Sequence, residues 1–155
     1  MQCIAKNRDG SRCTKRTLTH ELCAAHLRSL HGLEVRESRI PGAGKGLFYV
    51  GKTPLPAGHR LTEYSAPRVS STPDPTSDYV LEVSAGRYLD SRDPLNAAGR
   101  YINDRRGTGL RANTRFTRGA RIYRRNGRYY VPIFTTATVQ PGAELLIRYG
   151  RTYFH

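Results

Sequence analysis

The chain has 155 residues, which is enough for one compact domain with a small appendage and too few for two full domains. Its formal net charge of +14 and its isoelectric point of about 10.3 favour a polyanionic partner, although a solvated basic surface without a dedicated partner is the alternative. Three cysteines exclude a closed set of disulfides. No signal peptide is predicted, because the basic N-terminus has no apolar stretch after it, and no membrane span is predicted, because no apolar run approaches about 18 residues.

Residues 1–31 are predicted to form a zinc-binding module. Nine, nine and two residues separate its four candidate ligands, Cys3, Cys13, Cys23 and His26. Thiolates and imidazole are the ligands that tetrahedral zinc prefers, and four of them close a structural site. His20 and His31 are rival ligands, and three buried free thiols are the alternative to a metal site. Because so short a segment buries little core, bound Zn²⁺ would stabilise it, in a reducing compartment.

Residues 32–50 are predicted to form two strands around a turn that contains Gly42, Gly44 and Gly46. Leu47 stands where a dinucleotide-binding fingerprint has its third glycine, and the glycine after Lys45 breaks the pattern of a P-loop. The glycines allow the backbone to approach a ligand closely, without matching either motif. A plain hairpin is the alternative.

The middle of the chain alternates short strands with turns. A strand is predicted at residues 60–64, and two more are predicted within residues 78–90. Residues 65–77 are rich in Pro, Ser and Thr and lack periodicity, which predicts a surface loop. Residues 93–96 are typical of a turn or of a helix start.

The clearest local signal is Asn126-Gly127 between two strand patterns, which predicts a hairpin with a type I′ turn. A last strand is predicted at residues 144–148. Nine arginines lie in this hairpin and in the loop region before it: Arg105, Arg106, Arg111, Arg115, Arg118, Arg121, Arg124, Arg125 and Arg128. We expect some of them to project together and to bind DNA or nucleosomes with little sequence preference; a solvated face without a partner is the alternative.

Three stretches, residues 38–48, 100–104 and 144–150, occur in the order glycine turn, Arg-Tyr-Ile-Asn-Asp and Glu-Leu-Leu-Ile-Arg-Tyr-Gly. This ordered set resembles the SET domain of protein lysine methyltransferases, and the resemblance covers about residues 33–154. It implies a mostly β fold, with short sheets around a C-terminal pseudoknot in which the second and third stretches meet. The predicted division is a zinc module at residues 1–31 and a SET domain at residues 32–155.

The resemblance also implies site residues. Tyr149 would be the catalytic residue that orients the substrate amine. The substrate-lysine channel would include Tyr64, Tyr101 and Ile147. The cofactor would be bound by Gly44, Lys45, Gly46, Arg100, Asn103, Asp104, Tyr153 and Phe154. Strand packing is the alternative for Tyr149 and Tyr64, a turn amide for Asn103, and an apolar anchor for Tyr153 and Phe154.

The activity implied is S-adenosylmethionine-dependent lysine methylation of a histone or another basic chromatin protein, in the nucleus, or in the host nucleus if the chain is viral. The chain departs from the family pattern at Asp104-Arg105-Arg106, where the family usually has His followed by Ser or Cys, and it lacks a Cys-rich tail. These features favour the alternative, an inactive SET-scaffold module that binds nucleic acid or chromatin. The intact Tyr149-Gly150 pair and the glycine turn disfavour that alternative.

Overall fold

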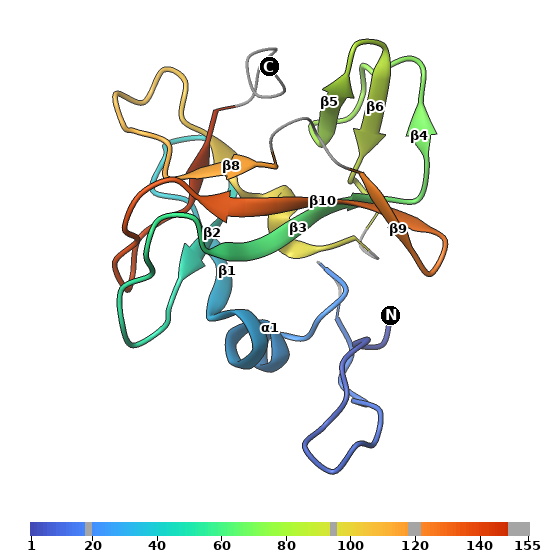
Figure 1. The fold of residues 1–155 in the computed structure, drawn as a ribbon, viewed down its shortest axis with the longest axis vertical. Coiled ribbons are helices and arrows are strands. Elements are labelled where there is room, and N and C mark those ends of the chain that lie inside the picture. Colours follow the sequence, from blue (N-terminus) through green and yellow to red (C-terminus); the bar gives the residue numbers. More distant parts are fainter. Residues whose placement is uncertain (18–19, 94–95, 118–121, 149–155) are drawn as a thin grey trace.

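The computed structural model describes residues 1–17, 20–93, 96–117 and 122–148 (Figure 1). The elements are, in chain order, α1 (Ala24–His31), β1 (Leu33–Glu37), β2 (Lys45–Tyr49), β3 (Arg60–Ala66), β4 (Val69–Ser70), β5 (Val80–Ser84), β6 (Arg87–Asp90), the 3₁₀ helix η1 (Ala98–Tyr101), β7 (Asn103–Asp104), β8 (Thr114–Phe116), β9 (Tyr123–Arg125), β10 (Arg128–Thr135) and β11 (Leu146–Ile147). Within these residues no helix is both long and apolar enough to cross a membrane.

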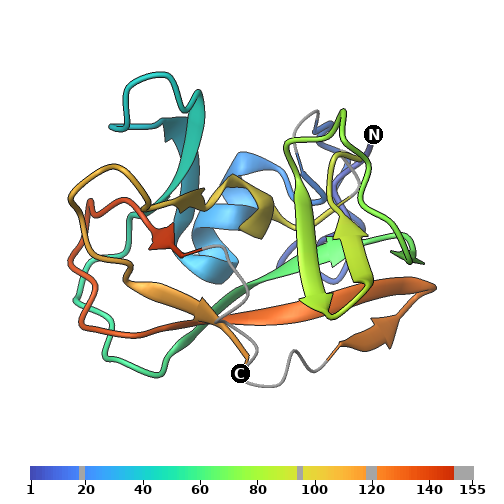
Figure 2. The ribbon, with the colours of Figure 1, turned by 90° about the horizontal axis from the view of Figure 1, so that it is seen from above.

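Short sheets make up most of the fold. Strand β10 pairs with β3, β8 and β9, and it crosses the middle of the molecule beside β3 (Figure 1). The β1–β2 hairpin and the β4–β6–β5 sheet lie towards opposite ends of the molecule (Figure 2). Strands β7 and β11 form a separate parallel pair. The predicted mostly β fold is confirmed.

The sequence signals locate most of the turns correctly. Asn126 and Gly127 both have positive φ, at 51° and 76°, and they join β9 to β10 as a type I′ turn requires. The predicted strands around the glycine turn are β1 and β2, which pair antiparallel. One difference lies in the predicted surface loop at residues 65–77, where the two residues of β4 pair with β6.

Strand β11 is hydrogen-bonded to both ends of a loop made by residues 103–114. The Arg105 N–H donates to the Ile147 carbonyl at 2.8 Å, and the Asn113 N–H donates to the Leu146 carbonyl at 3.0 Å. The Asn113 side chain donates to the Glu144 carbonyl at 2.9 Å and accepts from the Leu146 N–H at 2.8 Å. Both ends of the loop therefore hold β11, and the second and third sequence stretches meet as expected.

A single core connects the N-terminal residues to the sheets. Cys3, Leu22 and Leu27 belong to the same buried cluster as Leu33, Tyr64 and other strand residues. Helix α1 is capped by Gly32, whose left-handed φ of 65° lets its N–H bond to the Arg28 carbonyl. The division of the chain at residue 31 stays a prediction, and the packing across that point is continuous.

Replacing Gly99 by Ala should lower the free energy of unfolding by about 1–3 kcal/mol. A Cβ at Gly99 would overlap with the backbone carbonyl of Glu63 in β3 and would lie 2.8 Å from the Ile133 Cδ1 atom, so no change of rotamer relieves the clash. Urea unfolding measures the difference. A free energy of unfolding equal to that of the parent protein would show that η1 and β3 do not pack this closely.

Candidate functional site

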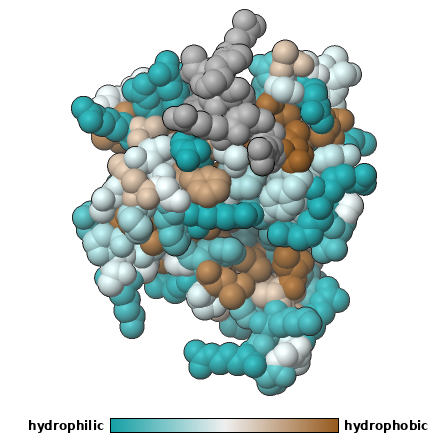
Figure 3. Space-filling view, viewed as in Figure 1, coloured by the Kyte–Doolittle hydropathy of each residue, from teal (hydrophilic) through white to brown (hydrophobic). Residues whose placement is uncertain are grey.

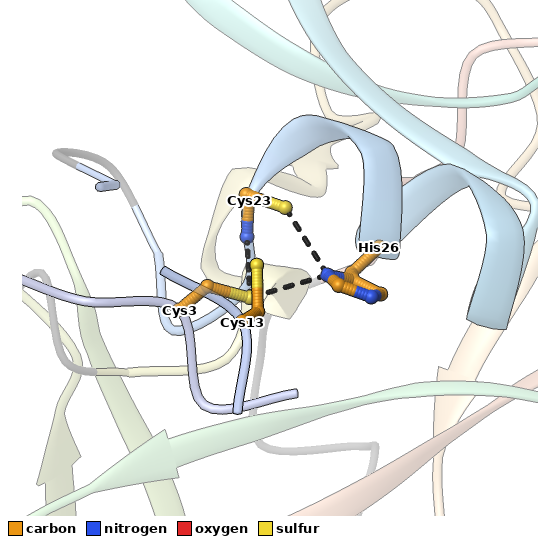
Figure 4. A group of neighbouring side chains, drawn as sticks. All are labelled: Cys3, Cys13, Cys23 and His26. Carbon is orange, nitrogen blue, oxygen red and sulfur yellow. Dashed lines mark hydrogen bonds between the residues drawn. The ribbon is translucent and has the colours of Figure 1, made fainter. Parts of the chain in front are cut away.

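Three thiols and an imidazole meet between the N-terminal segment, residues 1–17, and helix α1 (Figure 4). The ligand atoms of Cys3, Cys13, Cys23 and His26 all lie within 4.8 Å of one another, and the three cysteines are buried. The His26 Nδ1 atom is 3.6 Å from the Cys3 sulfur and 3.3 Å from the Cys23 sulfur. In tetrahedral zinc coordination a sulfur and a nitrogen ligand lie about 3.5 Å apart. The donor set and its spacing therefore fit Zn²⁺.

The local hydrogen bonds favour a thiolate at this cluster. Burial opposes ionisation of the Cys23 thiol, but hydrogen bonds from the backbone and side chain of His26 lower its pKa to about 7. The Cys23 N–H donates to the Cys3 sulfur at 3.2 Å. Burial raises the pKa of the Cys3 thiol all the same. The hydrogen bonds from His26 thus favour the Cys23 thiolate, and a thiolate is the form that binds metal.

The two rival histidines lie outside the cluster. The His20 Nδ1 atom accepts the Leu22 N–H at 3.3 Å, and the His20 ring packs edge-on against Tyr101. Burial lowers the pKa of His20 to about 4, so the ring is neutral at pH 7. His31 is the last residue of α1. Among the described residues the structure thus selects His26 as the fourth candidate ligand.

A second site is a cavity of about 660 Å³ between the glycine turn, the start of β5 and the η1–β7 segment. Its lining includes seven of the residues proposed from the sequence as cofactor or channel residues: Gly44, Lys45, Tyr64, Arg100, Tyr101, Asn103 and Asp104. These residues come from three separate parts of the chain: the glycine turn with the start of β2, strand β3, and the η1–β7 segment. Residues proposed for the cofactor and residues proposed for the lysine channel therefore line the same cavity, although the sequence analysis assigned them to separate sites.

Asn103 and Asp104 are held in position at the cavity by local bonds. The Asn103 side chain donates to the Lys45 carbonyl at 2.9 Å, which ties β7 to the glycine turn. The Asp104 carboxylate accepts the backbone N–H and the guanidinium of Arg106, with an ion-pair distance of 2.6 Å. The acidic residue that departs from the family pattern is thus paired with the arginine two positions later, and its backbone stays in β7.

Arg100 is a buried guanidinium in the cavity wall. It donates to the carbonyls of Ser91 and Arg92 at 3.0 and 2.7 Å, and to the Tyr101 hydroxyl at 2.7 Å. Its guanidinium carbon lies 5.0 Å from the centre of the Tyr79 ring and 4.7 Å from that of Tyr101. These contacts attach the segment that follows β6 to the wall of the cavity.

Sequence reasoning missed Asp78, Tyr79 and Val80 as cavity residues. The Tyr79 carbonyl accepts the Tyr64 hydroxyl, which fixes the ring of Tyr64 at the cavity. The sequence predicts a strand in the first part of residues 78–90, but no local signal indicates that the residues at its start line a cavity.

Gly46 and Ile147 are not part of this lining. Gly46 lies against the Glu144 carboxylate, which accepts the Ser38 hydroxyl at 2.6 Å and the Arg39 N–H at 2.9 Å. Ile147 is fully buried in β11. The residues proposed at Tyr149, Tyr153 and Phe154 lie outside the described part of the chain.

Comparison with known proteins yields structural likeness alone. No family model and no curated protein matches the chain. Solved structures do match, including an active polycomb repressive complex 2 in the stimulated state, with a TM-score of 0.54 and 19% identity over 76% of this chain. The polycomb repressive complex 2 of Chaetomium thermophilum matches with a TM-score of 0.56 and 18% identity over 78% of this chain. A humanized mutant of that complex, bound to an inhibitor, matches with a TM-score of 0.57 and 17% identity over 79% of this chain.

This chain covers only 15–16% of the length of those matched chains. At such low identity the likeness shows the fold, which is SET-like and carries a Cys₃His cluster. It leaves the activity to be argued from the residues of this chain.

We predict that freshly purified protein contains about one zinc ion per chain, since four protein ligands close a structural site. Cys23→Ser should lose the metal and loosen residues 1–31, because a hydroxyl replaces one thiolate ligand. His20→Gln is the matched control and should keep the metal, since His20 lies outside the cluster. Elemental analysis measures the zinc content, and a protein purified without zinc would contradict the assignment.

We also predict that Gly46→Ala and Glu144→Ala are not additive. A Cβ at residue 46 would overlap with the Glu144 carboxylate and displace it from Ser38 and Arg39. Each single substitution should cost about 1–3 kcal/mol of stability, whereas Gly46→Ala should cost little once Glu144 is already Ala. Urea unfolding of the four proteins gives the coupling energy, and strictly additive losses would show that the two residues do not interact.

Proposed function

We propose that this chain is an S-adenosylmethionine-dependent protein lysine methyltransferase that acts on a histone or another basic chromatin protein. The observation that carries the proposal is the cavity at which the glycine turn, β7 and the tyrosines Tyr64 and Tyr101 meet. The SET-like fold supports it, because the glycine turn and the β7–β11 pair lie where the family resemblance requires them.

The cavity fits a methyl donor of this kind. Its volume of about 660 Å³ lies within the range of ligand pockets, roughly 300–1,000 Å³. Its lining includes the Asp78 carboxylate, the Asn103 amide, the Asp104–Arg106 ion pair and Lys45, which pairs with Glu37. A cofactor with an ammonium, a carboxylate and a sulfonium group needs polar partners, and the Asp78 carboxylate could serve its cationic groups.

The residues that would hold the cofactor are Asn103 and the backbone at Gly44 and Lys45. When bound, the cofactor supplies an electrophilic methyl group on a positively charged sulfur. The Asn103 amide already bridges β7 and the Lys45 carbonyl, so the two walls of the cavity keep a fixed distance. Such fixed geometry lowers the entropic cost of aligning two reactants.

The wall of the cavity favours a neutral amine, which is the nucleophilic form of lysine. A free lysine has a pKa of about 10.4. The Arg100 guanidinium beside the Tyr101 ring places a positive charge in the wall, and a like charge disfavours the ammonium form. Tyr64 and Tyr101 are both buried and belong to the same lining. The Arg100 charge would lower the pKa of a lysine side chain inserted beside it.

Zinc would have a structural role in this protein. All four candidate positions of a tetrahedral ion are filled by protein side chains, so no position is left for a substrate. The cluster joins residues 1–17 to α1, and α1 packs on β1. Metal binding would thereby stabilise one side of the core at a distance from the cavity.

The direct test is transfer of a labelled methyl group from S-adenosylmethionine to histones by the full chain. If the Tyr149 hydroxyl orients the amine, Tyr149→Phe should reduce turnover by about tenfold or more without changing the unfolding midpoint. The matched control is Tyr88→Phe, which removes a hydroxyl from β6 outside the cavity lining and should leave turnover unchanged.

Equal turnover in the Tyr149→Phe variant and in the parent protein would contradict the role of Tyr149. A parent protein that methylates no histone would instead support the alternative function, an inactive scaffold that binds chromatin.

A further inference from the structure

Residues 1–17 form a basic ribbon that projects from the body of the protein (Figure 1). Two antiparallel bridges define it, Gln2 with Arg16 and Lys6 with Arg12, and residues 8–11 form its tip. Five exposed cations lie on it: Lys6, Arg8, Arg12, Lys15 and Arg16. In the space-filling view, hydrophilic side chains dominate this end of the molecule (Figure 3).

The arginines of the β9–β10 hairpin are arranged differently. Arg125 forms an ion pair with Glu63 at 3.0 Å and lies 4.2 Å from the centre of the Tyr130 ring. Arg128 donates to the Asn96 side chain, and Arg124 lies over the Tyr129 ring. Residues 118–121 lie outside the described part of the chain. The hairpin cluster expected from the sequence is thus engaged with the protein's own side chains at each of these three positions.

Among the residues that the structure describes, the cations of the basic ribbon have no such partners. Across the described ranges of the chain, none of the five forms an ion pair with an acidic residue. The single acidic residue of the ribbon, Asp9, accepts the Ser11 hydroxyl and N–H, and these bonds lower its pKa. Asp9 therefore shapes the tip of the ribbon, and the cations are left to face solvent.

Lys6 and Arg12 are direct cross-strand neighbours. Like charges placed opposite each other destabilise a strand pair, so this arrangement does not serve the stability of the ribbon. An anion bound between them would turn the repulsion into attraction for both side chains. The pair is therefore better explained by a polyanionic ligand than by folding.

The candidate metal cluster makes the basic ribbon a rigid element. Cys3 and Cys13 lie within it, and the Cys3 N–H donates to the Lys15 carbonyl at 2.9 Å. The Gln2 side chain donates to the Cys13 carbonyl at 2.8 Å. A backbone that is already ordered loses less entropy when its side chains bind a ligand.

The composition of the basic ribbon favours a nucleic-acid duplex over a single strand. It has no aromatic residue, so it offers no platform on which unpaired bases would stack. Its contacts are those of Lys and Arg with phosphates, which are regularly spaced along a duplex. We propose that the basic ribbon binds the phosphate backbone of double-stranded DNA without reading its sequence.

The position of the basic ribbon connects this contact with the candidate active site. Arg16 lines a cavity of about 570 Å³ together with Arg28 and Lys45, and Lys45 also lines the candidate cofactor cavity. The base of the ribbon, at Arg16, therefore lies on the same side of the protein as Lys45. The inference itself stands without methyl transfer, since it concerns only the charges and rigidity of residues 1–17.

The test is fluorescence anisotropy of a labelled DNA duplex titrated with the zinc-loaded full chain at several salt concentrations. The variant is Lys6→Gln with Arg12→Gln. The matched control is Lys52→Gln with Arg68→Gln, which removes the same charge from two exposed positions outside the ribbon. The ribbon variant should bind on the order of tenfold more weakly at low salt, and its slope of log K against log salt should be smaller by about 1.8, for two lost phosphate contacts.

Zinc content is measured on every protein, so that loss of the ribbon fold is distinguished from loss of charge. Equal weakening by the ribbon variant and the control would overturn the proposal, because binding would then follow net charge alone. An acidic peptide or a single strand that binds the chain more tightly than the duplex does would also overturn it.

Discussion

The parallel pairing of β7 with β11 is the constraint on which the rest of the candidate site depends. Strand β11 has two residues, and such a short pair is stable only because Asn113 and Arg105 hold it from both ends of the loop. The pairing places Asn103 beside the glycine turn. It also brings Glu144 to the turn, where its carboxylate bonds to Ser38 and Arg39. Strand β11 and the residues just before it thus fix the glycine turn, β7 and residue 113 relative to one another.

The basic residues of this protein fall into two groups, those bound by other groups of the protein and those exposed to solvent. Several arginines of the main body are bound internally: Arg100 to two carbonyls and a tyrosine, Arg106 to Asp104, and Arg125 to Glu63. The cations of residues 1–17 face solvent instead. Residues 1–17 carry five cations and one acidic residue, so they form a local concentration of exposed positive charge.

Sequence reasoning succeeded where a local rule decides the structure. The Asn126-Gly127 turn follows from two residues that tolerate positive φ, and the ligand set follows from cysteine and histidine spacing. The pairing of β7 with β11 was expected only from the family resemblance. Contacts between residues far apart in the sequence were not predicted. Ser38 and Glu144 are 106 positions apart, and no sequence pattern indicates the hydrogen bond from the Tyr64 hydroxyl to the Tyr79 carbonyl.

The measurement that tests the account most directly is a calorimetric titration of S-adenosylmethionine into the purified, zinc-loaded chain. The account predicts a single site of micromolar affinity, weakened when Asn103→Ala removes the amide that bridges β7 and the Lys45 carbonyl. Absence of binding at millimolar cofactor, in a protein that contains zinc and unfolds cooperatively, would contradict the claim that this cavity serves methyl transfer.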